Sequence, residues 1–377
     1  MIFKNGTFIE INEKRCLNVL HHGVECSHCI SHCPGNAIHY DHNHVYLNKD
    51  RCSGCGLCLS DCPTEVFRSK QWDETTITQD IETEGWKITE FFCDRHTLPY
   101  KSDKHKERGA AQLPACLSSV SRGAWYAIGL KTEVEVHLDQ CQDCPMVETV
   151  ARLVHNVNTA AEWLQASGHP PQISVIHQSA QGKIKKSLLA IETGLKVTSR
   201  RDLFVSLFNR GQQLAGKTAG SAPEEVDRKT RNMLLPEWQK RLEDVFQKNL
   251  TGSLNPAYWP TIKINDQCVN CGMCRNYCPS GTLQMEVKDG ICEHSFTSGR
   301  CLDCRICELF CPKEAINRDR EKVARPFESQ AIHAVPVVDC KQCESTTVKN
   351  DEQLCYWCQG GAQSDNELKH TLKELLR

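Results

Sequence analysis

Two stretches of the chain share one cysteine spacing, CVNCGMCRNYCP at residues 268–279 and CLDCRICELFCP at residues 301–312. In each, four cysteines follow the pattern C-x2-C-x2-C-x3-C, and a proline follows the fourth. This spacing places three thiolates around one turn, so that all three reach the same metal centre. The proline fixes φ and directs the chain away after the last cysteine. The two stretches therefore predict a pair of neighbouring metal clusters in one small fold.

The tandem motif resembles the signature of bacterial two-cluster ferredoxins, in which the cysteine before the proline binds the other cluster. The resemblance implies one [4Fe-4S] cluster on Cys268, Cys271, Cys274 and Cys311. It implies a second [4Fe-4S] cluster on Cys301, Cys304, Cys307 and Cys278. Residues 258–325 are thus expected to form a two-cluster module.

A related motif lies near the N-terminus, where residues 52–63 are complete but residues 26–34 lack the first cysteine. Gly23 stands at the missing position, and Cys16 is the natural substitute. The same resemblance implies one cluster on Cys16, Cys26, Cys29 and Cys62, and another on Cys52, Cys55, Cys58 and Cys33. A three-iron cluster, or ligation by His21 or His22, are alternatives to ligation by Cys16. Residues 1–80 are expected to form this module.

Four further cysteines have no compact spacing: Cys93, Cys116, Cys141 and Cys144. They lie among expected strands at 87–93, 133–138 and 172–177 and expected helices at 115–129 and 146–165. Alternation of this kind predicts a parallel sheet with right-handed crossovers, and ligands bind at the carboxyl edge of such sheets. We therefore expect residues 86–200 to form a small α/β domain with the four cysteines at that edge.

This stretch also resembles the iron–sulfur delta subunit of methyl-viologen-reducing hydrogenases. The similar residues are the strand-ending FFC, the helix-opening LPAC, an Arg-Gly-Ala turn and DQCQDCP. The resemblance implies a fifth cluster, [2Fe-2S] or [4Fe-4S], on Cys93, Cys116, Cys141 and Cys144. A structural zinc ion and free core thiols are the alternatives.

The last cysteine group has the pattern C-x2-C-x11-C-x2-C and comprises Cys340, Cys343, Cys355 and Cys358. Four thiolates on two knuckles suit tetrahedral zinc, so residues 326–377 are expected to form a zinc-ribbon-like segment and a C-terminal helix. A rubredoxin-type iron site and a fifth cubane are alternatives. The remaining Cys292 is expected to pack as a small apolar residue in a hairpin.

These patterns predict an α+β chain in which two two-cluster ferredoxin-like modules flank a small α/β parallel-sheet domain, with a C-terminal zinc-ribbon-like knuckle. Residues 201–257 are expected to form a linker with a bridging helix. The basic residues of 183–204 predict a solvated helix face or a docking patch for an acidic partner or an anionic membrane surface.

The composition of the chain excludes several classes of function. The chain has 377 residues, 25 of them cysteine, and a net charge of −2. This charge balance argues against general nucleic-acid binding, which needs a basic excess. We expect no transmembrane segment and no secretion signal, because long apolar runs are absent. The C-x-x-C grouping favours metal ligation over disulfides, which predicts a reducing compartment, the cytoplasm.

The sequence therefore predicts an electron-transfer protein, a polyferredoxin or the iron–sulfur subunit of an oxidoreductase, that is not catalytic by itself. Its predicted partners, by analogy, are a molybdopterin oxidoreductase such as a formate dehydrogenase, or a hydrogenase. One alternative is an assembly or maturation factor that delivers clusters. A second alternative is a redox-sensing regulator.

Overall fold

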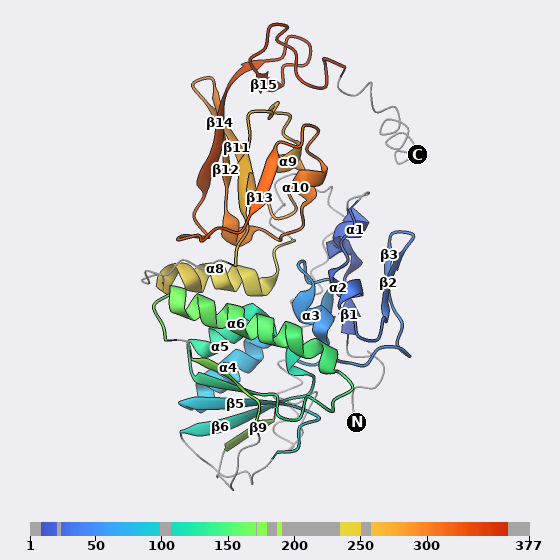
Figure 1. Ribbon diagram of the computed structural model, residues 1–377, viewed down its shortest axis with the longest axis vertical. Coiled ribbons are helices and arrows are strands. Elements are labelled where there is room, and N and C mark those ends of the chain that lie inside the picture. Colours follow the sequence, from blue (N-terminus) through green and yellow to red (C-terminus); the bar gives the residue numbers. More distant parts are fainter. Residues whose placement is uncertain are drawn as a thin grey trace, which may run out of the picture. The chain divides into compact units, whose positions relative to one another are not determined.

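The computed structural model describes residues 9–20, 24–98, 107–170, 172–178, 187–190, 234–249 and 258–360. The chain folds into two compact units (Figure 1). Unit 1 comprises Met1–Thr230 and Leu234–Leu254, and unit 2 comprises Arg231–Met233 and Asn255–Arg377. Helices and small sheets occur in both units, which confirms the mixed helix and strand content expected from the sequence.

Unit 1 begins with a small module built from short elements. Its helices are α1 (Leu17–Leu20), α2 (His28–Ser31) and α3 (Leu57–Asp61). Its strands are β1 (Ile9–Ile11), β2 (Ile38–Asp41), β3 (His44–Leu47) and β4 (Phe67–Ser69). β1 pairs antiparallel with β4, and β2 with β3. The β2–β3 hairpin turns through His42 and Asn43, which both have positive φ, as a tight two-residue hairpin turn requires.

The rest of unit 1 is an α/β domain around one parallel sheet. Its strands are β5 (Ile88–Cys93), β6 (Arg108–Leu113), β7 (Glu133–His137), β8 (Ile173–Ile176) and β9 (Ser187–Ala190). They run parallel in the order β8-β7-β5-β6-β9. The central strand β5 is buried on both faces, since Phe91 and Phe92 are both fully enclosed. The parallel sheet predicted from the alternation of strands and helices is thus observed.

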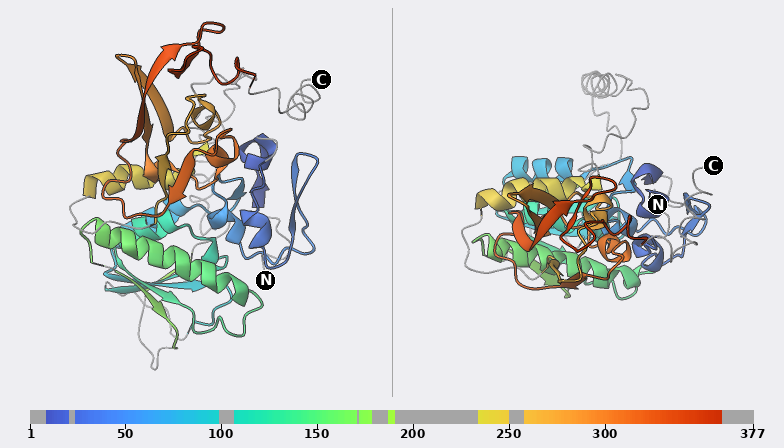
Figure 2. Two further views of the ribbon diagram at one scale, coloured as in Figure 1. Left: turned by 45° about the horizontal axis from the view of Figure 1, so that its top comes forward. Right: turned by 90° about the horizontal axis from the view of Figure 1, so that it is seen from above.

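Helices cover this sheet in two further layers. They are α4 (Glu74–Glu84), α5 (Arg122–Gly129), α6 (Val150–Ala166) and α8 (Glu237–Asn249). Figures 1 and 2 show α5 and α6 lying between the sheet and α8. Trp238 of α8 stacks on Trp163 of α6 at 6.2 Å between ring centroids, and Phe246 is fully buried. The helix expected within residues 201–257 therefore packs on the α/β domain.

Three details of the α/β domain differ from the sequence expectation. Strand β9 lies within the basic segment 183–204, where a helix face was expected, so the described part of that segment is a strand of the sheet. Strand β6 was not expected, because its small residues do not have a typical strand composition. The packing explains why β6 contains a glycine, because a Cβ at Gly109 would overlap the ring of Trp86. The helix expected over residues 115–129 is divided into the 3-10 turn η2 (Leu117–Ser119) and α5, which begins after the capping Ser121.

Unit 2 contains a second set of short elements with a larger antiparallel sheet. Its helices are α9 (Met273–Asn276) and α10 (Ile306–Leu309). Its strands are β10 (Thr261–Ile264), β11 (Leu283–Lys288), β12 (Ile291–Phe296), β13 (Ile316–Asp319), β14 (Gln330–Asp339) and β15 (Thr346–Val348). β10 pairs with β13, while the other strands form a sheet in the order β11-β12-β14-β15. Cys292 lies fully buried in the β11–β12 hairpin, which confirms its expected packing role.

Several predicted features fall outside the described residues. They are His21 and His22, most of the basic segment 183–204, the first part of the bridging-helix segment and the C-terminal helix. Within the described part of the chain, no helix has both the length and the apolar character needed to span a membrane.

Candidate metal centres

The first N-terminal site is a small cavity beside α1, α2 and the β2–β3 hairpin. Four cysteines line it: Cys16, Cys26, Cys29 and Cys62. Cys62 directly follows α3 and comes from the second motif, whereas the other three come from the first part of the module. Most other lining side chains are apolar, among them Ile38, Val45 and Phe67. The structure therefore brings the four predicted ligands together.

A reciprocal hydrogen bond explains how the distant Cys16 reaches this cavity. The side-chain amide of Asn18 donates to the carbonyl oxygen of Cys26 at 2.9 Å. The backbone N–H of Cys26 donates in return to Asn18 Oδ1 at 2.7 Å. This pair holds the segment after Cys16 against the start of the C-x2-C run. Cys16 thus lines the cavity although it lies outside the regular motif.

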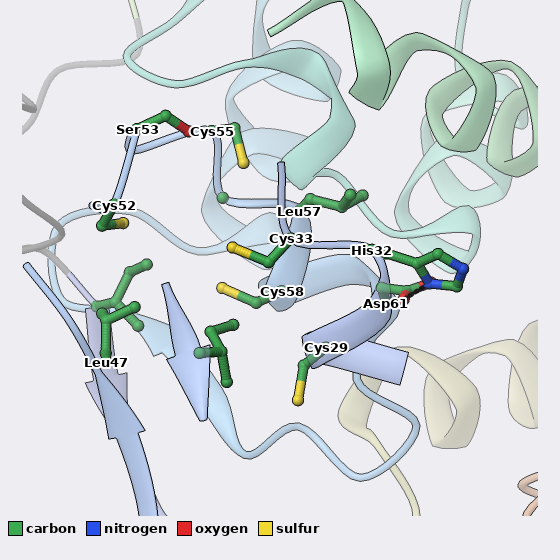
Figure 3. A pocket seen from close by; sticks show the side chains of 13 residues that line it. Cys29, His32, Cys33, Leu47, Cys52, Ser53, Cys55, Leu57, Cys58 and Asp61 are labelled. Carbon is green, nitrogen blue, oxygen red and sulfur yellow. Dashed lines mark hydrogen bonds and ion pairs between the residues drawn. The ribbon is translucent and has the colours of Figure 1, made fainter. Parts of the chain in front are cut away.

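The second N-terminal site lies between the two motifs. Five cysteines line its cavity: the predicted set Cys33, Cys52, Cys55 and Cys58, and Cys29, which also lines the first site. Figure 3 shows them around one space, with Cys29 at its border. Gly56 adopts φ +73° directly after Cys55 and immediately precedes α3, so the chain turns sharply between Cys55 and Cys58. The structure brings these four predicted ligands together as well.

The burial of these thiols bears on what the sites can hold. Burial raises the pKa of Cys26 and of Cys55 to about 11 each, and the pKa of Cys58 well above its usual value. Without a metal such thiols stay protonated, because a buried thiolate needs a compensating positive charge. Iron in a cluster supplies that charge, so apolar cavities lined by four thiols fit an iron–sulfur group.

Unit 2 repeats this arrangement. One cavity is lined by Cys268, Cys271, Cys274 and Cys311, the set expected from the first C-terminal motif. The second expected set is Cys278, Cys301, Cys304 and Cys307. Burial raises the pKa of Cys304 to about 12, and the charges of Cys301 and Cys278 contribute to the increase. These three thiols therefore lie close together, and burial, with contributions from Cys304 and Cys278, raises the pKa of Cys307 to about 12 too.

A buried arginine contacts this second set. The guanidinium of Arg318 donates to Cys301 Sγ at 3.7 and 3.9 Å. It also pairs with Asp303 at 2.6 Å and lies 3.4 Å from Glu308. Only 10% of the Arg318 side chain is exposed, so its charge acts on the sulfur with little screening by water. The sequence analysis did not identify Arg318. Its position seven residues after Cys311, in β13, is the feature from which its contact with the site could have been suspected.

The four cysteines of the α/β domain lie at the carboxyl edge of the sheet. Cys93 ends β5, Cys116 precedes η2, and Cys141 and Cys144 lie in the loop after β7. Burial, followed by the charges of Cys116, Cys93 and Cys144, raises the pKa of Cys141 to about 12. The topology therefore gathers the four thiols, although they are far apart in the sequence.

The C-terminal cysteines form a tighter group. The sulfurs of Cys340, Cys343, Cys355 and Cys358 all lie within 4.8 Å of one another. The Cys343 and Cys355 sulfurs are 3.6 Å apart. Four thiolates bound about 2.3 Å from one zinc ion form a tetrahedron with edges of about 3.8 Å. This group therefore has the dimensions of a site for a single tetrahedral ion.

Hydrogen bonding prepares the same group for metal. Although burial opposes ionisation, backbone N–H groups of Cys355, Gln342 and Cys343 lower the pKa of Cys340 to about 6. The N–H of Cys355 lies 3.2 Å from Cys340 Sγ. The thiolate is the form that binds zinc, so these N–H groups favour the ligating state of Cys340, whereas burial and the neighbouring thiols raise the pKa of Cys358 to about 12.

Sequence reasoning also missed a polar contact beside the second N-terminal site. The buried carboxylate of Asp61 accepts a hydrogen bond from Arg152 of α6 and lies 2.6 Å from His32 Nδ1 (Figure 3). Asp61 precedes Cys62, and the sequence carries no signal that pairs it with a residue so far along the chain.

Comparison with known proteins agrees with the cysteine geometry. Residues 23–66 match the family model described as a 4Fe-4S dicluster domain. The chain is also 30% identical over 95 residues to a ferredoxin of Rickettsia felis, and this match covers 84% of that ferredoxin and 22% of the chain. The chain belongs to the ferredoxin family. This ferredoxin is much longer than that relative, so the family relation describes only part of it.

Two other relatives match over shorter segments. An uncharacterised ferredoxin of Methanocaldococcus jannaschii is 47% identical over 45 residues, which are 11% of this chain and 27% of that protein. Pyruvate synthase subunit PorD of Methanothermobacter marburgensis is 35% identical over 48 residues, which are 13% of this chain and 56% of that subunit. This ferredoxin thus spans about a quarter of the first relative and about half of the second.

Proposed function

We propose that this ferredoxin is an electron-transfer protein that carries single electrons through four [4Fe-4S] clusters. The ligands are the four cysteine sets of the two tandem motifs, paired as the motif crossing implies. The observation that carries the proposal is that, in three of the four sets, cysteines from both halves of a tandem motif line the same mainly apolar cavity.

The proposed chemistry follows from this enclosure. A bound cluster supplies reversible one-electron chemistry. Four cysteine ligands occupy every iron of a cubane, so no iron is left open to bind a substrate. The surrounding apolar side chains, such as Ile38 and Phe67, limit access of water to the sulfurs. Sites of this kind pass electrons and perform no bond chemistry, which favours a carrier over an enzyme.

Zinc at the C-terminal group completes the proposed cofactors. Cys340, Cys343, Cys355 and Cys358 would hold it, because their sulfur separations suit one tetrahedral ion. Its proposed role is structural. β15 lies between the two knuckles and pairs with β14, so a bound ion would fasten this end of the sheet.

The proposed partner is an oxidoreductase complex of the cytoplasm. The relative from Methanothermobacter marburgensis is a pyruvate synthase subunit, which supports a partner of the oxidoreductase class. A molybdopterin enzyme or a hydrogenase is the type expected from the sequence. Purification from the native host under anaerobic conditions, with cross-linking, would identify it.

Metal analysis and redox titration test the function. Anaerobically purified protein should hold about 16 to 20 irons and one zinc per chain, from the number of ligand sets. Its EPR signals should appear on reduction and vanish on reoxidation without loss of iron. An iron content near eight would contradict the four clusters. Rapid transfer of iron to an apo-ferredoxin would instead favour a cluster-delivery protein.

A further inference from the structure

Two of the four cysteines of the α/β domain pack against the second N-terminal site. Cys55 of that site forms a buried apolar cluster with Leu57 and Met146. Cys116 and Cys144 of the α/β domain pack against the same cluster. Thiols from two different predicted sites therefore share one apolar contact within unit 1.

Close packing of α3 against η2 holds this contact. The Ser60 hydroxyl donates to the carbonyl oxygen of Ser118 at 2.6 Å, and both residues are buried. A Cβ at Gly56 would come within 2.7 Å of the Ser119 Cβ, so only glycine permits this approach. The buried Asp61–Arg152 pair joins α3 to α6 on the same side. The contact is thus a fixed part of unit 1.

The spacing of the central thiols distinguishes them from a zinc site. The C-terminal sulfurs lie within 4.8 Å of one another, the spacing of ligands around one ion. Among the residues that the structure describes, neither the central set nor the ferredoxin-type sets reach that spacing. A cluster holds its ligand sulfurs farther apart than one ion does, because several irons lie between them. The central set therefore lacks the compact spacing of a single-ion site and shares this feature with the ferredoxin-type sets.

We infer that Cys93, Cys116, Cys141 and Cys144 hold an iron–sulfur centre that exchanges electrons directly with the centre held by Cys33, Cys52, Cys55 and Cys58. This inference rests on the proposed function. One electron leaves one centre and is gained by the other, with no proton or atom transferred. A low-potential one-electron donor, dithionite in the experiment below, supplies the electron. Electron transfer weakens steeply with distance, and the shared apolar contact keeps the two sites adjacent.

The metal content of variants of the full chain tests the identity of the centre. The double variant Cys141→Ala and Cys144→Ala should lose iron and keep one zinc per chain. The matched double variant Cys355→Ala and Cys358→Ala should lose zinc and keep its iron. Loss of zinc from the first variant would overturn the inference. Two zinc ions per wild-type chain would also overturn it, and this measurement needs no variant to fold.

EPR of the dithionite-reduced protein tests the direct exchange. Two adjacent paramagnetic centres broaden or split each other's signals and relax quickly. Clusters within each two-cluster module also couple, so the change from the wild-type spectrum is the readout. Cys58→Ala and Cys144→Ala should each remove the part of the coupling that joins the central centre to the N-terminal site, whereas Cys307→Ala, in unit 2, should leave that part in place. N-terminal signals whose broadening and relaxation are unchanged in Cys144→Ala would overturn the inference.

The two proposals fail in distinguishable ways. If the N-terminal and C-terminal clusters titrate reversibly while Cys144→Ala changes neither iron content nor the magnetic interaction, only the inference fails. If iron is lost on reduction from every site in the wild-type chain, the electron-transfer function fails first.

Discussion

At the scale of single residues, hydrogen bonds to sulfur differ between the two modules. Backbone N–H groups donate to Cys62 Sγ from Val66 at 3.3 Å and to Cys311 Sγ from Ala315 at 3.2 Å, so this bond is common to both. Unit 2, by contrast, also has a side-chain hydrogen bond to sulfur, which Arg318 donates to Cys301. Ser69 stands at the matching position of the N-terminal module, seven residues after Cys62. We therefore expect the two modules to differ in reduction potential.

Arg318→Gln should lower the reduction potential of the centre on Cys278, Cys301, Cys304 and Cys307. A cation and its N–H···S bonds stabilise the reduced, more negative state, and the variant lacks the cation. An EPR-monitored redox titration measures the shift. Arg320→Gln is the control, because Arg320 pairs with the same Asp303 at 2.5 Å and is 52% exposed. An equal shift in both variants would contradict the role of the sulfur contact.

His294 makes unit 2 sensitive to acid. Burial, aided by the nearby His333, lowers the pKa of His294 to about 4. The neutral ring lies 3.0 Å from Asn270 Oδ1. A depressed histidine pKa contributes stability that is complete above the unfolded pKa near 6.5 and is lost as the pH falls towards 4.

Between pH 7 and pH 5, protonation of this residue should lower the stability as the pH falls. Urea unfolding of the intact, metal-loaded chain at several pH values measures it. His294→Gln should remove most of this slope, whereas the exposed His42→Gln should retain it, since 88% of the His42 side chain is exposed. A slope unchanged in His294→Gln would assign the acid sensitivity to another group.

At the scale of elements, α3 joins the N-terminal module to the α/β domain. Its residues Leu57 and Ser60 contact the α/β domain, and Asp61 pairs with Arg152. The Asp61 carboxylate is 1% exposed, so its pairing with the 28% exposed Arg152 is only weakly screened.

Asp61→Asn should loosen this junction by about 1 to 3 kcal/mol, because Arg152 and His32 lose a buried charged partner. Amide hydrogen exchange of α3 and α6 measures the local opening. Glu82→Gln is the control, since its pair with Lys131 is largely exposed and should cost less than about 1 kcal/mol. Equal exchange in the two variants would show that the junction depends on apolar packing alone.

At the scale of the whole molecule, the zinc site should load metal independently of the cluster sites. The double variant Cys355→Ser and Cys358→Ser should lose the single zinc and keep all iron, because the zinc thiols share no ligand with the cluster sets. Elemental analysis with the visible iron–sulfur spectrum checks this. Loss of half the iron together with the zinc would show that the C-terminal knuckle is needed to build the unit 2 clusters.

Local cysteine spacing by itself predicted most ligands of the two tandem motifs and the tight C-terminal group, but not Cys16 or the four cysteines of the α/β domain. It could do so because ligands three residues apart reach one metal through the geometry of a single turn. The parallel sheet was also predictable from the order of strands and helices. Strand β6 was missed because it contains Gly109, which is atypical of strands. The close contact of Gly109 with Trp86 explains this residue, and that contact cannot be recognised in the sequence.

Only the tertiary structure decided which sites touch. The approach of Cys55 to Cys116 and Cys144, the pairing of Asp61 with Arg152 and the packing of α8 on α6 join residues that are distant in the chain. The spacing of cysteines in the sequence determines only whether residues close together in the chain can reach the same metal. Contacts between distant segments depend on how whole elements pack, and that packing places the α/β cysteines beside the N-terminal module.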